Sequence, residues 1–176
     1  MFASVIILSA VESAAFAQSS SVDVRLGPAV QARTADLGQA ELDGQRLELQ
    51  HEVEQAIARS HKAPLQVHLV IQDIQPNRPT SRELGLSTSL NAGSFGLGGA
   101  AITGEVVLAD GSRLPIRYRF FETQLRDEVN FTTWGDADAA FNTLAEDIGA
   151  GRPPNDSRSW PPPHRPSAPT GTRLLN

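Results

Sequence analysis

The chain has 176 residues, of which 40% are hydrophobic, and this is enough for one core of ordinary size. Its formal net charge of −5 argues against a nucleic-acid partner, because binding to phosphate backbones needs a basic surface. The absence of cysteine excludes disulfides and a lipidated N-terminal cysteine, so we expect stability to come from packing alone.

The first seventeen residues have the features of a secretory signal peptide. An apolar stretch runs from Phe2 to Val11, and Ala15-Phe16-Ala17 forms an A-x-A cleavage pattern after it. The stretch is too short to cross the roughly 30 Å of hydrocarbon in a bilayer. We therefore predict a signal peptide over residues 1–17 and a periplasmic or secreted mature chain without a membrane span.

Two elements are predicted next. Alternation of apolar and polar residues from Val22 to Leu26 predicts a half-buried strand, which Pro28 closes. Between Ala40 and Ser60 apolar residues recur at helical spacing and predict a long helix. Its first part has an alternative, because Asp43-Gly44 also suits a hairpin turn. The apolar positions of this helix are Leu42, Leu49, Val53, Ala56 and Ile57.

The central part of the chain contains one clear strand and one irregular segment. Leu65, Val67, Leu69 and Ile71 alternate with Gln66, His68, Val70 and Gln72, which predicts a central strand up to Gln72. A turn or loop is expected over 76–79, because two prolines cannot continue a ladder. The segment 84–101 is rich in Gly, Ser and Leu and predicts either an irregular strand pair or a mobile loop.

A hairpin is predicted over 102–121, where two strand patterns flank Ala109-Asp110-Gly111. A three-residue loop with Gly in the left-handed conformation places all the large apolar partners on one face. A two-residue loop would mix the two faces, so the parity of the pattern selects the longer turn. The predicted pairs are Leu108 with Ser112, Val106 with Leu114, Gly104 with Ile116, and Ile102 with Tyr118. Thr103, Glu105, Arg117 and Arg119 then fall on a solvated face.

A second helix is predicted from about Thr133, whose hydroxyl is placed to cap it, to a stop at Gly149 and Gly151. Its apolar stripe consists of Trp134, Ala137, Phe141, Leu144, Ala145 and Ile148. The residues 152–176 are rich in proline, serine and charge, and this composition predicts a disordered tail. Trp160 and the prolines around it suit an extended recognition segment, although a spacer is the simpler interpretation.

Together these elements predict a single α+β domain over residues 18–151. We expect a small, mostly antiparallel sheet with two helices packed on one face and a disordered proline-rich tail after it. Residues that follow one another as strand, helix, strand and hairpin can all contribute to one core of this size.

The segment 92–96 comes within one residue of the G-x-S-x-G pattern that exposes a nucleophilic serine. A hydrolase of that type needs a later histidine, and His164, the one that follows, lies in the predicted tail. Ser94 is therefore kept only as a candidate ligand-binding residue. Arg117 and Arg119 are the other candidates, since two arginines on one strand face can hold an anion, with the segment 84–101 as a glycine-rich lid.

No other residues point to catalysis, a metal or a cofactor. His51, His61 and His68 lack a ligand spacing such as H-x-x-x-H, so no metal site is predicted. Asp136 and Asp138 suit a catalytic carboxylate pair, but a place in the first turn of a helix explains them without chemistry. The glycines of the segment 84–101 lack the lysine of a P-loop and a helix directly after them.

The order of elements from Val22 to Gly149, with the hairpin Ile102-Thr-Gly-Glu-Val-Val-Leu-Ala-Asp-Gly and the helix led by Trp134, resembles small proteobacterial envelope proteins of unknown function. Many of those proteins are lipoproteins, whereas this chain has no cysteine to lipidate. The resemblance implies a periplasmic location and no chemistry. We therefore expect a non-enzymatic envelope module that contacts a protein partner, with a small-ligand or anion-binding domain, or a hydrolase, as alternatives.

Overall fold

The structure is a computed structural model that describes residues 20–60, 64, 66–123 and 132–155. The predicted signal peptide, Leu65 and nearly all of the predicted tail lie outside these residues. The elements follow in the order β1 (Ser21–Leu26), α1 (Pro28–Gln31), α2 (Thr34–Leu37), α3 (Gln39–Ala58), β2 (Gln66–Gln75), α4 (Ser81–Leu86), β3 (Gly99–Val107), β4 (Arg113–Phe121) and α5 (Gly135–Gly149). This composition of helices and strands confirms the α+β class.

The four strands form one sheet in the order β1-β2-β3-β4. β1 and β2 are parallel, whereas β2 with β3 and β3 with β4 are antiparallel. The prediction of a mostly antiparallel sheet was therefore wrong, since the sheet is mixed. The physical reason is the connection between β1 and β2: its long helix returns the chain to the end at which β1 began, so both strands run the same way.

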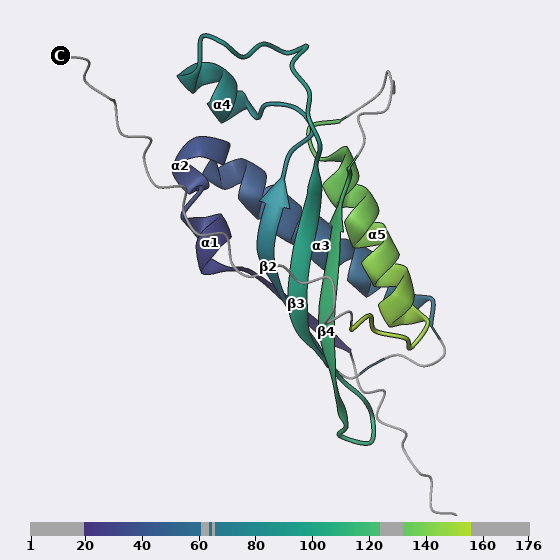
Figure 1. The fold of residues 1–176 in the computed structure, drawn as a ribbon. Helices are drawn as coiled ribbons and strands as arrows, with labels where there is room; N and C mark the ends of the chain where they lie inside the picture. Colours follow the sequence, from purple (N-terminus) through teal and green to yellow (C-terminus); the bar gives the residue numbers. More distant parts are fainter. Residues whose placement is uncertain (1–19, 61–63, 65, 124–131, 156–176) are drawn as a thin grey trace, which may run out of the picture.

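α3 and α5 lie together on one face of the sheet, and the other face carries no helix in this view (Figure 1). α3 packs against β1, while α5 packs against β3 and β4. The two helices also pack against each other and enclose the core. Its largest fully buried side chains include Phe141, Leu42, Leu49, Leu69, Ile71, Ile102, Ile116, Leu144 and Ile148.

α3 and α5 run parallel. Near their first turns the Trp134 indole N–H donates to Glu41 Oε2 at 3.0 Å, and near their last turns Gly149 lies against Ala56. A Cβ atom at Gly149 would come within 2.9 Å of the Ala56 carbonyl oxygen, so only glycine allows the helices to approach so closely. The glycine predicted as a stop signal therefore also sets the spacing of the helix pair.

The hairpin has the predicted register. Val106 pairs with Leu114, Gly104 with Ile116, and Ile102 with Tyr118. At the turn the Leu108 N–H donates to the Ser112 carbonyl at 2.9 Å, and Gly111 adopts a φ of +81°. The odd-length loop selected by parity is thus confirmed, although β3 begins at Gly99, before the expected first residue.

The helices differ from the prediction at two places. α3 continues without a break through Asp43 and Gly44, so the alternative hairpin there was wrong. α5 begins at Gly135 with Trp134 as the N-cap residue and without a side-chain cap, so the predicted Thr133 cap was also wrong. The reason is tertiary, because the Thr133 carbonyl accepts a hydrogen bond from the Asn77 N–H at 2.8 Å and holds the chain outside the helix.

Candidate functional site

Asn77 is the polar centre of one end of the domain. β2 stops at Gln75, Pro76 follows, and the Asn77 side chain is only 1% exposed. Its Nδ2 donates to Asp136 Oδ2 at 2.6 Å, and its Oδ1 accepts from the Asp136 N–H at 2.8 Å. Asp136 Oδ2 also accepts from the Gly98 N–H at 3.0 Å. Asn77 thereby ties the end of β2 to the start of α5 and to the approach to β3.

The segment between β2 and β3 is anchored along its length. Thr80 and Glu83 form a capping box at the start of α4, with the Glu83 N–H donating to Thr80 Oγ1 and the Thr80 N–H donating to the Glu83 carboxylate. Arg78 Nη1 donates to the Ala92 carbonyl at 3.1 Å. Arg82 Nε donates to the Ala35 carbonyl of α2 at 3.1 Å.

The segment 84–101, predicted as a glycine-rich lid, differs in structure from that prediction. Its first residues belong to α4 and its last residues to β3, so neither an irregular strand pair nor an unstructured loop describes the segment as a whole. The pattern T-x-x-E over 80–83 is the sequence signal for this helix start, and the sequence interpretation missed it. Asn77 had no local signal, because its partner Asp136 is 59 residues away.

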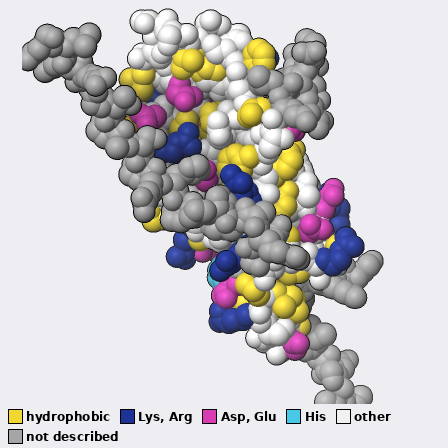
Figure 2. Space-filling model, in the orientation of Figure 1, with side chains coloured by type: hydrophobic (Ala, Val, Ile, Leu, Met, Phe, Trp, Pro, Cys, Tyr) yellow, Lys and Arg dark blue, Asp and Glu magenta, His cyan; other side chains and the backbone are white. Residues whose placement is uncertain are grey.

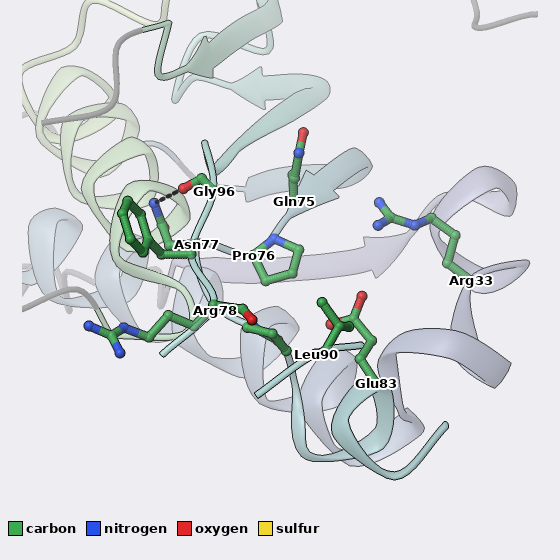
Figure 3. A pocket seen from close by; sticks show the side chains of 11 residues that line it. Arg33, Gln75, Pro76, Asn77, Arg78, Glu83, Leu90 and Gly96 are labelled. Atoms are coloured by element: carbon green, nitrogen blue, oxygen red, sulfur yellow. Dashed lines mark hydrogen bonds between the residues drawn. The ribbon is translucent and has the colours of Figure 1, made fainter. Parts of the chain in front are cut away.

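A shallow groove of about 220 Å³ lies where β2 ends. Its lining residues come from the linker between α1 and α2, from the end of β2 and from the α4 segment. Figure 3 shows the Arg33 side chain extended from that linker, and Glu83 beside Leu90 across from Pro76. Ser94 and Phe95 also line the groove. The groove is therefore a meeting point of three segments that are distant in sequence.

Ser94 belongs to a turn in this groove. Its N–H donates to the Asn91 carbonyl at 2.9 Å, and its Oγ accepts from the Asn91 N–H at 3.1 Å. A base is needed to activate a serine, but neither His51 nor His68 lines the groove. His51 contacts Gln55 on α3, and His68 lies on the sheet. His61 and His164 lie outside the described residues.

Arg117 and Arg119 lie on the open face of β4, and both are exposed. The Arg119 guanidinium stacks over the Phe121 ring, 4.7 Å from its centroid. Neither arginine lines the groove that contains Ser94. The structure therefore confirms that the two arginines share the solvated face, and it places Ser94 in a separate feature.

Asp136 and Asp138 occupy the first turn of α5, as predicted, but they have different environments. Asp136 belongs to the Asn77 network. Asp138 lies against α3, where burial and the nearby charges of Glu48 and Glu52 raise its pKa from 3.8 to about 6. A hydrogen bond from Gln45 acts in the opposite direction. The two carboxylates therefore do not form a shared acid–base pair.

The described residues contain no cluster of three or more His, Asp or Glu side chains suited to a metal ion. Within the same residues no helix has both the length and the apolar character that crossing a membrane requires. Comparison of the chain with models of known families, with curated proteins and with solved structures finds no match. The functional argument therefore rests on the surface of this domain alone.

Several exposed apolar side chains lie in one stretch of the chain, and we call this stretch the α4 surface and define it as Leu84, Leu86, Leu90 and Phe95. Leu86 and Phe95 are 57% and 58% exposed, and in the described chain only Leu47 among the large apolar residues outside this surface is comparably exposed. Figure 2 shows yellow hydrophobic side chains at the end of the molecule where α4 lies, with basic and acidic side chains interspersed further along the same face.

Proposed function

We propose that the protein is an exported, non-enzymatic envelope module that works by contacting another protein through the α4 surface. The observation that carries the proposal is the gathering of exposed Leu86, Phe95 and their neighbours on one anchored segment. Single exposed apolar side chains are common on the surfaces of soluble proteins, whereas several of them together usually mark an interaction site.

The anchoring of the segment supports the same proposal. The α4 segment, residues 76–98, is held to α2 by the Arg82 hydrogen bond and to the start of α5 by the network of Asn77. The hydrogen bond from Arg78 to the Ala92 carbonyl ties the segment to itself. A surface that is ordered before it binds loses less conformational entropy on association. Leu86 and Phe95 are therefore presented to a partner by a supported segment.

The size of the groove favours a protein over a small ligand. Pockets for small molecules usually enclose roughly 300–1,000 Å³ and bury most of the ligand. The groove beside Leu90 and Phe95 has about 220 Å³ and is widely open. It suits a single side chain of a partner better than a whole ligand, and Leu90 and Phe95 would form its apolar wall.

Site-specific photo-crosslinking tests the contact. We expect a crosslinking amino acid at Leu86 to yield one discrete protein adduct in cells, and Phe95→Ser to abolish that adduct because both residues belong to one surface. The matched control is Leu47, which is 53% exposed but lies on α3, and a crosslinker there should yield no such adduct. Equal adducts from both positions, or none from Leu86, would contradict the proposal.

The export part of the proposal is supported by the Ala15-Phe16-Ala17 pattern and has its own test. N-terminal sequencing of the native protein should begin at Gln18. A chain that retains Met1 in a cytosolic fraction would refute export and leave the contact surface to be judged by crosslinking.

A further inference from the structure

The arginines on the open face of the sheet fall into two groups. Arg25 Nε lies 2.8 Å from Asp23 Oδ2, and Arg113 pairs with Glu105. Arg117 and Arg119 make no ion pair with a carboxylate of the described residues. Both lie on the edge strand β4 and are exposed, so two guanidinium groups on one strand lack the partner that the other two possess.

The two unpaired arginines are arranged for alternating contacts. They are two residues apart on a strand, which places their side chains on the same face about 7 Å apart along it. Arg119 rests on the Phe121 ring at 4.7 Å. Stacking fixes the plane of the guanidinium and leaves the N–H groups along its rim free to meet a carboxylate.

The backbone of the same strand is open to an added strand. The Arg117 N–H points away from β3, because it donates to the Pro154 carbonyl at 2.9 Å. The Glu122 N–H points the other way, to the Gly98 carbonyl beside β3. Since the direction alternates along a strand, the N–H groups of Arg119 and Phe121 also face the outer edge.

The chain itself shows that this edge accepts another segment. Asn155 forms a parallel bridge with Arg117, outside the named strands of the sheet. On the other side of Arg117, Pro115 has no N–H to offer, and the Arg117 N–H already donates to the Pro154 carbonyl. Strand addition over the whole stretch from Arg117 to Phe121 therefore requires the partner to take the place of Pro154 and Asn155 beside Arg117.

We propose that an extended acidic peptide segment of a partner protein displaces Pro154 and Asn155 from Arg117 and adds as a strand along the β4 edge from Arg117 to Phe121. The peptide then sets carboxylates at alternate positions against Arg117 and Arg119. Cross-strand neighbours on one face repeat every two residues, so the two arginines specify a Glu-x-Glu or Asp-x-Asp pattern. This inference goes beyond the proposed function, because it uses none of the residues of the α4 surface.

The charge of the whole chain favours a peptide over a broad anionic surface. A membrane or a nucleic acid would approach many residues at once, and a formal net charge of −5 opposes that approach. A single extended strand contacts only the edge of β4, where Arg117 and Arg119 have no carboxylate partner among the described residues. The positive charge of Arg117 and Arg119 therefore favours an acidic peptide strand as the partner at this edge.

Fluorescence anisotropy with the full-length protein tests the proposal. We expect a labelled peptide of alternating Glu and Thr to bind saturably, and the double variant Arg117→Gln with Arg119→Gln to weaken binding about tenfold. The matched control is Arg25→Gln, because Arg25 lies on the same face but already pairs with Asp23. It should bind the peptide as the parent protein does. Urea denaturation of each variant verifies that the fold is retained.

Two further measurements separate strand addition from general attraction of charges. Peptide binding should slow hydrogen exchange at the Arg119 and Phe121 amides, and a peptide with the same Glu residues in one block should bind more weakly. The proposal is overturned if the double variant binds the alternating peptide as well as the parent protein does, or if the peptide with its Glu residues in one block binds as tightly as the alternating peptide. Binding of phosphatidylserine vesicles in preference to the peptide would also overturn it. Because the crosslinking test of the α4 surface involves none of these residues, either proposal can fail alone.

Discussion

On the covered face of the sheet, Val67, Leu69 and Ile71 of β2 are buried against the helices, whereas Gln66 and His68 of the same strand remain in contact with solvent on the open face. The two faces thus differ in what their residues do. Burial of the covered face removes apolar area from water and stabilises the fold. The open face contributes little to stability, so its charges are available for binding.

The largest expected effect comes from a core residue behind the covered face. Phe141 of α5 is fully buried, and Phe141→Ala should lower the free energy of unfolding by roughly 3–5 kcal/mol through lost burial and a cavity. Urea denaturation followed by circular dichroism measures this change. As the matched comparison, Arg25→Ala on the open face should change stability by less than about 1 kcal/mol, because surface ion pairs contribute little. Similar losses from both variants would refute the division between the faces.

A smaller loss is expected at the end of the sheet, where polar contacts replace apolar packing. Asn77→Ala should cost roughly 1–3 kcal/mol, because it leaves the partly buried Asp136 N–H without its acceptor. The α4 segment should also become more sensitive to proteolysis, since its tie to α5 is lost. Asn91→Ala is the control, because Asn91 lies in the same segment and is exposed. If proteolysis increases equally in both variants, Asn77 has no special role.

The smallest effect concerns a polar residue between the helices that cover the sheet. The pKa of Asp138 is raised to about 6, so the folded state holds this proton more tightly than the unfolded state does. Its contribution to stability is complete below the ordinary value of 3.8 and is lost as the pH rises through about 6. Asp138→Asn, which mimics the protonated form, should therefore stabilise the protein at neutral pH and have little effect at pH values near 4.

Urea denaturation of Asp138→Asn and the parent protein at several pH values measures this difference. Glu146→Gln is the control, because Glu146 is an exposed carboxylate on the same helix. Its stability should follow the pH dependence of the parent. A gain in stability of Asp138→Asn over the parent that is no larger at neutral pH than at acidic pH would show that burial against Glu48 and Glu52 does not perturb this carboxyl.

Elements with a long, regular pattern could be predicted from the sequence. The stripe from Trp134 to Ile148 identified α5, and the parity of the residues around Gly111 identified the hairpin register, because each pattern allows only one arrangement to bury its apolar side chains. The short helix α4 was missed, since its capping box over 80–83 stands in a segment whose glycines suggested a loop.

The candidate site could be predicted only in part. Arg117 and Arg119 were assigned to the solvated face from alternation alone, and the structure confirms this. The contact of Arg119 with Phe121 and the bridge from Arg117 to Asn155 had no sequence signal. The α4 surface was not predicted either, because exposure of Leu86 and Phe95 depends on which parts of the chain fail to cover them.

The sequence by itself determined where the strands β1 to β4 and the helices α3 and α5 lie, although not their ends, and which side of each is apolar, because these properties depend on spacing along the chain. The tertiary structure alone decided that β1 runs parallel to β2, that Asn77 forms a hydrogen bond with Asp136, and that Gly149 packs closely against Ala56. Each of these contacts joins residues far apart in sequence, so it exists only once α3 and α5 have closed over the sheet.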